Sequence, residues 1–241
     1  MEKCSLKDRA LQKEGLLVTE GAFLFERLLE SGLPIENIWC SPAVYEKYNL
    51  ADYPCQVLSR EELSQTAGYN FHRGVLALAR APELPPPPSN EAISDRGILV
   101  LPRLGDPENL GGILRSALGL GIKTVLLGPG NPYVYGRKAL RSGMGAQFKL
   151  NLYRFDSPET LFDWNGGKRP VIATALEENS LSLKKFSPPE KWLLLMGHEG
   201  EGLDKPFLNK ADYKLIIPQT EFVDSLNVNV ATGILLYHLS H

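Results

Sequence analysis

Residues 105–117, GDPENLGGILRSA, form the first segment whose residue types could do chemistry. Its Asp-Pro pair marks a helix start, with the aspartate as N-cap and the proline in the first turn. The three-to-four residue spacing of a helix then puts Asn109, Gly112 and either Arg115 or Ser116 on one face. Two adjacent glycines destabilise a helix by about 1 kcal/mol each relative to alanine, so something must approach them closely. Either tight packing or a ribose or phosphate beside Arg115 would explain them.

Residues 194–203, LLMGHEGEGL, form a second glycine-rich segment that directly follows an apolar run. Their G-x-x-G-x-G spacing differs from the G-x-G-x-x-G fingerprint of an NAD-binding oxidoreductase, and we therefore place that class last. A glycine loop here still fits a nucleoside cofactor. Glu199 is the carboxylate best placed to meet it, with helix capping as its alternative role. His198 is assigned no role.

A third segment places polar groups at the start of an apolar helix near the carboxyl terminus. Asp224 or Ser225 can cap this helix, and Asn227 and Asn229 follow. Ordinary capping would explain Ser225 alone, whereas three such residues beside an apolar strand end indicate a ligand edge. The helical spacing predicts a buried face made of Leu226, Val230, Gly233, Ile234 and Tyr237.

Six apolar runs alternate with helical or loop segments in the second part of the chain. Such βαβ alternation predicts an α/β fold with a mostly parallel sheet and helices on both faces. Ligands then belong at the carboxyl ends of the strands, where the three segments lie. The runs are residues 97–101, 122–127, 148–152, 171–176, 192–196 and 215–217.

A proline-rich segment separates this part from a smaller amino-terminal one. Four consecutive prolines within residues 83–91 favour an extended linker. Before it, the patterns predict a small α/β unit with a capping box that begins at Ser59. Its expected elements are a helix over 21–30 and strands over 35–40, 56–58 and 74–79. We expect domains at 1–82 and 96–241, joined by a linker at 83–95.

The composition fits a globular protein of 241 residues, 43% of them hydrophobic, with a net charge of −2. Residues 100–155 carry a local charge of +6, which indicates either a solvated basic face or a polyanion site. No apolar run is long enough for a membrane helix, and no secretory signal opens the chain, so we expect a cytoplasmic protein. Three cysteines without a CxxC pair support neither a disulfide framework nor a zinc site.

The three segments, in this order, resemble the motifs of the SpoU (TrmH-like) family of RNA ribose 2′-O-methyltransferases, within the SPOUT class. The first matching stretch is residues 106–117, the second is 197–203, and the third is 217–218 with 225–231. The resemblance covers most of the chain. Its amino-terminal part, with residues 18–21 and 72–77, is similar to the small substrate-binding domain often attached in this family. Departures occur at Gly143 and Asn229, where the family often has serine.

This resemblance implies a carboxyl-terminal trefoil knot that forms a site for S-adenosylmethionine, and a homodimer built through the catalytic domain. Arg115 takes the central catalytic position, and the positions that shape the site are Asn109, Glu199, Ser225 and Asn227. The expected cofactor-binding residues are Gly197, Ile217, Leu226, Thr174 and Met196. The expected RNA-binding residues are Arg103, Arg137, Lys138 and Arg141.

The implied reaction is methylation of a ribose 2′-hydroxyl in structured RNA, with ribosomal RNA favoured and no metal required. A transfer RNA substrate, methylation of a base, and a catalytically silent RNA-binding member are the alternatives. Arginine is protonated at neutral pH, so we expect Arg115 to act as a cation that lowers the pKa of the hydroxyl and orients a phosphate. The proton would pass to that phosphate or to water, although the family is often described with this arginine as the base.

Overall fold

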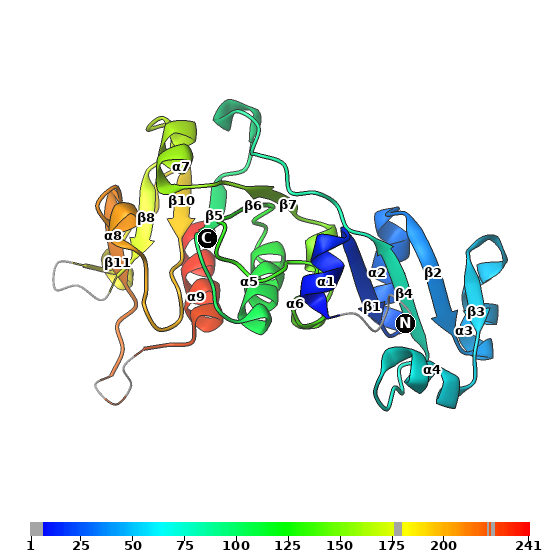
Figure 1. Cartoon of the computed structure of the whole chain (residues 1–241). Helices are drawn as coiled ribbons and strands as arrows, with labels where there is room; N and C mark the ends of the chain where they lie inside the picture. The colour runs from blue at the N-terminus through cyan, green and yellow to red at the C-terminus, as the bar shows by residue number, and fades with distance from the viewer. Residues whose placement is uncertain (1–6, 176–179, 221, 223–224) are drawn as a thin grey trace.

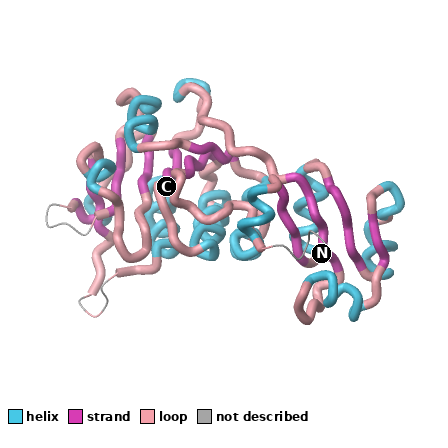
Figure 2. Tube along the Cα trace, in the orientation of Figure 1, coloured by secondary structure: helices cyan, strands magenta, loops and turns pink. Residues whose placement is uncertain are grey.

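The computed structural model describes residues 7–175, 180–220, 222 and 225–241, which contain two separate β-sheets (Figure 1). The expectations for Cys4, Leu176 and Asp224 lie outside these residues. Figure 2 shows the strands of the two sheets as distinct groups, with helices packed around each. No helix within the described residues combines the length and apolar character needed to cross a membrane.

The amino-terminal sheet has the strand order β1-β4-β2-β3. Its predicted helix, strands and capping box are confirmed within two residues, but its first strand was not predicted. That strand is buried along its whole length, polar residues included, so it lacks the alternation that identifies a half-buried strand. The elements are α1 (Asp8–Lys13), β1 (Leu16–Glu20), α2 (Ala22–Ser31), β2 (Ile35–Cys40), α3 (Pro42–Tyr48), β3 (Cys55–Val57), α4 (Arg60–Ala67) and β4 (Val75–Arg80).

The larger sheet has the order β7-β6-β5-β10-β8-β11-β9, and every neighbouring pair in it is parallel. The prediction of a mostly parallel sheet is therefore confirmed. The run at 148–152 begins three residues too early, because residues 146–148 form a 3₁₀ turn before the strand, and the run at 122–127 begins two residues before its strand. The strands are β5 (Gly97–Leu101), β6 (Thr124–Leu127), β7 (Asn151–Arg154), β8 (Val171–Thr174), β9 (Leu181–Ser182), β10 (Trp192–Leu195) and β11 (Tyr213–Ile216).

Helices cover both faces of the larger sheet, as predicted. Along β5, Leu99 and Leu101 join one apolar core, and Ile98 and Val100 join the other, because successive side chains point to opposite faces. The first core contains residues of α5 (Pro107–Gly119), α6 (Arg137–Gly143) and α9 (Val228–Ser240), and the second contains residues of α7 (Pro158–Asn165) and α8 (Lys205–Leu208).

The prediction of the buried face of α9 was wrong. Val230, Ile234 and Tyr237 are 51%, 39% and 61% exposed, and the helix instead buries Val228, Thr232, Leu235, Leu236 and Leu239. The helix is apolar on nearly every side, so its pattern could not identify the face that packs against α5 and the sheet. Its N-cap is Asn227, whose Oδ1 accepts the Asn229 N–H at 2.9 Å.

The proline-rich segment is attached to the larger sheet. Trp164 donates its indole N–H to the Pro88 carbonyl at 2.7 Å. The guanidinium of Arg169, which is 1% exposed, donates to the Asn90 side chain and to the carbonyls of residues 93, 95 and 96. These bonds satisfy a buried cation and fix the chain immediately before β5.

Candidate active site

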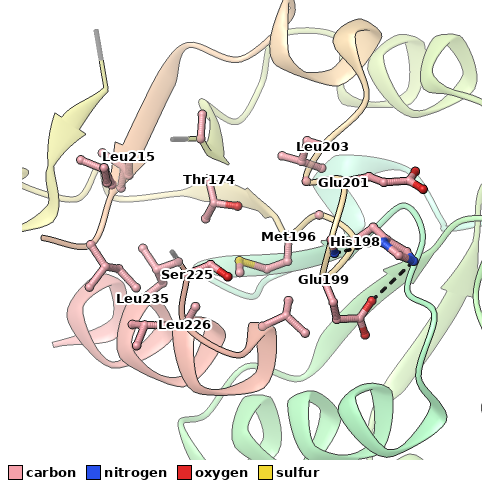
Figure 3. A pocket seen from close by; sticks show the side chains of 18 of the residues that line it. Thr174, Met196, His198, Glu199, Glu201, Leu203, Leu215, Ser225, Leu226 and Leu235 are labelled. Atoms are coloured by element: carbon pink, nitrogen blue, oxygen red, sulfur yellow. Dashed lines mark hydrogen bonds and ion pairs between the residues drawn. The ribbon is translucent and has the colours of Figure 1, made fainter. Parts of the chain in front are cut away.

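The three polar segments of the sequence converge at the carboxyl ends of β5, β10 and β11, which parallel pairing brings to one edge of the sheet. A cavity of about 460 Å³ lies there, a volume within the usual range for small-molecule sites. The loop after β10, the chain after β11 and the end of β8 line it (Figure 3). All five expected cofactor-binding residues are among the lining residues: Thr174, Met196, Gly197, Ile217 and Leu226.

The loop after β10 closes on itself beside this cavity. The N–H of His198 donates to the Gly202 carbonyl, and the N–H of Gly202 donates to the His198 carbonyl, each at 2.9 Å. A Cβ at position 197 would lie 2.3 Å from the Gly202 carbonyl carbon, so only glycine fits there. The loop thus presents backbone groups to the cavity, and Glu199 lies at its tip.

Glu199 accepts hydrogen bonds from the segment that opens α5. Its Oε1 accepts from Asn109 Nδ2 at 2.9 Å and from the Asp106 N–H at 3.4 Å, and its Oε2 accepts from the Gly105 N–H at 3.0 Å. Burial by itself would raise the pKa of this carboxyl, but the bonds from Asn109 and from the backbone outweigh it and lower the pKa. Glu199 is therefore ionised at neutral pH, with both oxygens engaged.

Asn109 continues this network into the third segment. Its Oδ1 accepts from Asn227 Nδ2 at 3.0 Å, while Asn227 also caps α9. The chain Glu199–Asn109–Asn227 thus joins the loop after β10 to the starts of α5 and α9. Three side chains far apart in sequence are held in one arrangement.

A second, polar pocket adjoins the cavity on the other side of this network. Arg115 is exposed there, and among the described residues no hydrogen bond or ion pair engages its guanidinium. Ser225 lies in the cavity rather than in this pocket. The polar side chains that line the pocket are Asp106, Glu108, Asn109, Arg115, Ser116, Ser142, Asn227 and Asn229. Sequence analysis gave Ser116 as the alternative to Arg115 on one helix face, but it did not predict Ser142, whose only signal is proximity to the motifs.

The adjacent glycines of α5 are explained by close packing. A Cβ at Gly111 would lie 2.2 Å from the Ala139 carbonyl oxygen of α6, and one at Gly112 would lie 2.4 Å from Asn229 Nδ2. The first contact lets α5 and α6 approach, and the second keeps the floor of the Arg115 pocket open.

The four expected RNA-binding residues have different surroundings. Arg103 pairs with Glu201, which lines the cavity, and Lys138 lies 3.8 Å from a Glu108 oxygen. Arg137 lies between the two sheets, where its side chain is 18% exposed, while that of Arg141 is 41% exposed. The arrangement therefore leaves Arg141 more accessible than Arg137.

Arg137 and Arg141 reach a carboxylate to which sequence analysis gave no role of its own. Glu20, at the end of β1, has a side chain that is 3% exposed, and one of its oxygens lies 3.3 Å from Arg137 Nε. Asp8 also pairs with Arg137 at 3.3 Å. The sequence signals for Glu20 are a charge that ends an apolar run and its place in residues 18–21, which carry part of the amino-terminal resemblance.

The chain is similar to known proteins along most of its length. The sequence model of the SpoU rRNA methylase family matches residues 96–237. The 23S rRNA (guanosine(2553)-2′-O)-methyltransferase RlmP of Bacillus subtilis is 29% identical over 228 residues, covering 94% of this chain and 89% of the relative. An uncharacterized tRNA/rRNA methyltransferase of Synechocystis is 31% identical over 238 residues, covering 94% of this chain and 84% of the relative.

The fold also matches that of solved structures. The AdoMet-bound rRNA methyltransferase of Sinorhizobium meliloti aligns with a TM-score of 0.82 at 23% identity, covering 97% of this chain and 90% of that chain. The family match includes all three segments that build the cavity and the Arg115 pocket. From its sequence and from the site that these segments form, the chain belongs to the SpoU rRNA methylase family.

Proposed function

We propose that this protein transfers the methyl group of S-adenosylmethionine to a ribose 2′-hydroxyl of ribosomal RNA. The observation that carries the proposal is the Glu199–Asn109–Asn227 network, which separates and aligns a cofactor-sized cavity and a pocket with an unpaired arginine. Membership of the SpoU rRNA methylase family supports the reaction class and the RNA substrate.

The cavity residues fit S-adenosylmethionine. Backbone groups of the loop after β10, including Gly197, suit the polar edges of a nucleoside, while Met196 and Leu226 supply apolar walls. Ile217 and Thr174 complete the lining. The bound sulfonium supplies a methyl group that is already activated by the positive charge on sulfur.

The protein must then position and activate a poor nucleophile, the ribose hydroxyl. Arg115, as a permanent cation, lowers the pKa of that hydroxyl and orients the neighbouring phosphate, which takes the proton directly or through water. Glu199 is a positioning residue, because its oxygens already accept bonds from Asn109 and the backbone. Asn227 holds the start of α9, and Ser225 lines the cavity that would hold the cofactor.

We propose that RNA contacts the positive segment from 100 to 155 and that residues 1–82 form a substrate-binding domain, joined through a linker at 83–95. In this arrangement, Arg103, Lys138 and Arg141 contact phosphates, which position RNA without reading its sequence. The exposed fractions of Arg103 (37%), Lys138 (57%) and Arg141 (41%) support this assignment. A cytoplasmic location follows, because a ribosomal RNA substrate would be met there.

A trefoil knot and a homodimer complete the proposal. The chain after β11 lines the same cavity as the loop after β10 and then returns to α9, which packs on α5, as a knotted path requires. On α9, Val230, Ile234 and Tyr237 form an exposed apolar row beside Gly233 of the Arg115 pocket. A second copy covering this row would bury it next to the reaction centre. Ile234→Glu should therefore shift the protein toward monomer in analytical ultracentrifugation, and an unchanged mass would contradict the dimer.

The test is transfer of a labelled methyl group from S-adenosylmethionine to total RNA of cells that lack this protein. We expect a 2′-O-methylnucleoside in ribosomal RNA from wild type and none from Arg115→Ala, with cofactor affinity by calorimetry unchanged. Label in transfer RNA would show that the substrate is transfer RNA and not ribosomal RNA. Label on a base would show that the enzyme methylates a base and not a ribose. Cofactor binding without transfer to RNA or to ribosomal subunits would indicate a silent RNA-binding member.

A further inference from the structure

Three arginines and a tyrosine surround the buried Glu20 carboxylate at the seam between the two sheets. Arg137 Nε lies 3.3 Å from the Oε1 atom of Glu20. The Oε2 atom of Glu20 lies 3.7 Å from Arg73 Nη1 and 3.9 Å from Arg141 Nη1. Arg73 belongs to the amino-terminal part and Arg141 to α6. This oxygen is buried and has no hydrogen-bond partner among the described residues. The distances from this oxygen to Arg73 and Arg141 are therefore short enough for the carboxylate to orient both guanidiniums, but too long for hydrogen bonds.

The guanidiniums of Arg73 and Arg141 remain accessible to a ligand. Their side chains are 49% and 41% exposed, whereas that of Glu20 is 3% exposed. Arg137, by contrast, is mostly buried and pairs with both Glu20 and Asp8. The three arginines exceed the two carboxylates by one positive charge, which one phosphodiester would neutralise.

Tyr69 adds a neutral aromatic group to this cluster. Burial and the Glu20 carboxylate raise the pKa of its phenol to about 12, so it keeps its proton at neutral pH. Its side chain is 46% exposed and its ring meets Phe71 edge to face, with 5.9 Å between centroids. An exposed ring beside cations is suited to stack on a nucleobase.

The cluster is next to the Arg115 pocket along α6. Ser142 lines that pocket, and the preceding residue, Arg141, reaches the seam. A polynucleotide whose ribose enters the pocket would meet Arg141 and then Arg73 on crossing this helix.

We propose that Arg73 and Arg141 together clamp one backbone phosphate of the RNA that flanks the target nucleotide, with Glu20 orienting both guanidiniums. The proposal rests on the RNA substrate proposed above. The clamp takes one arginine from each part of the chain. Substrates must therefore extend beyond the methylated nucleotide.

The test compares full-length wild type with the Arg73→Ala/Arg141→Ala double variant, using an in vitro transcript of 23S rRNA in filter binding across a salt series. Each lost phosphate contact reduces the slope of log affinity against log salt by about one, so loss of the one shared phosphate should reduce it by about one. In methyl transfer we expect KM for the transcript to rise about tenfold with kcat within about twofold, because phosphate contacts position the substrate and take no part in chemistry. The Arg73→Lys/Arg141→Lys variant, which keeps both charges, should recover most of the affinity.

A matched control is Arg96→Ala/Lys191→Ala. These two exposed cations precede β5 and β10, at the opposite edge of the sheet from the Arg115 pocket, and their loss should leave slope and KM as in wild type. An equal fall in slope for this control would overturn the clamp, as would a wild-type slope and KM in the folded Arg73→Ala/Arg141→Ala protein.

Where the double alanine variant does not fold, Arg73→Ala alone decides, since Arg73 is the more exposed of the pair. A slope reduced by about one supports the clamp, and an unchanged slope overturns it. The binding arm needs no methyl transfer, so failure of the proposed reaction in wild type is seen separately. Conversely, an active wild type with an unaffected double variant removes only the clamp.

Discussion

At the Arg115 pocket an exposed guanidinium lies among amides, hydroxyls and two carboxylates with which it forms no ion pair, whereas at the seam three guanidiniums surround the buried Glu20 carboxylate. Both regions lie on helices that cover the same face of the larger sheet, α5 and α6. The difference is in the partners. Arg115 has none among the described residues, while Arg137 has two carboxylates. An arginine without a partner can give its full charge to a substrate, and one with buried partners mainly holds the fold together.

The largest effect should come from removing the unpaired cation. Arg115→Ala should lower kcat for methyl transfer by about 10³-fold, the scale expected when a charged group that stabilises the transition state is lost. Arg115→Lys should also be strongly impaired, because lysine lacks the planar fork that orients a hydroxyl and a phosphate together. Single-turnover kinetics with labelled cofactor measures both, and Arg96→Ala is the control. Full turnover by the lysine variant would contradict a role of the fork.

The next effect should come from breaking the network between the cavity and the pocket. Asn109→Ala removes the donor to Glu199 and the acceptor for Asn227, so the two sites lose alignment. We expect kcat to fall about 10- to 100-fold, since small misplacements of reacting groups have large kinetic effects. Steady-state assays measure this, and Asn209→Ala, at an exposed asparagine that ends α8, is the matched control. Equal kcat for the Asn109 variant and wild type would remove the network from the mechanism.

At the seam, Arg137→Ala should act on stability more than on RNA binding. The change leaves Glu20 and Asp8 without this partner, and a destabilisation of about 2 kcal/mol is expected for a largely buried ion pair. Urea unfolding measures it, with Arg9→Ala at an exposed position of α1 as control. A reduced salt slope of RNA binding with unchanged stability would instead make Arg137 an RNA contact.

The smallest effect concerns pH. The lowered pKa of Glu199 means that its bonds stabilise the fold fully above its ordinary value of 4.5 and less as pH falls through the lowered pKa. Glu199→Gln should therefore be less stable than wild type at pH 7, and the two should converge toward pH 3. Urea midpoints across this range test the sign. A stability difference that stays constant with pH would show that the charge of Glu199 has no part in it.

Local signals predicted most elements of the fold. The Ser59 capping box, the Asp106 N-cap with its proline, and the apolar run of β5 depend on neighbouring residues, so they could be identified directly. The strand β1 and the buried face of α9 were not predicted, for the same reason: both elements are apolar or buried on nearly all sides. Without a polar face, the spacing of apolar residues does not show which side of an element is buried, and only tertiary packing decides it.

The sequence determined which segments carry the chemistry, the order in which they occur, and the parallel sheet that brings strand ends to one edge. Tertiary structure alone decided the partners: Glu199 bonds Asn109 about 90 residues away, and Glu20 meets Arg137 and Arg141 across more than 100 residues. The physical reason is range. Caps and periodicity act over a few residues, whereas the charge state and availability of a side chain depend on whatever the fold brings beside it.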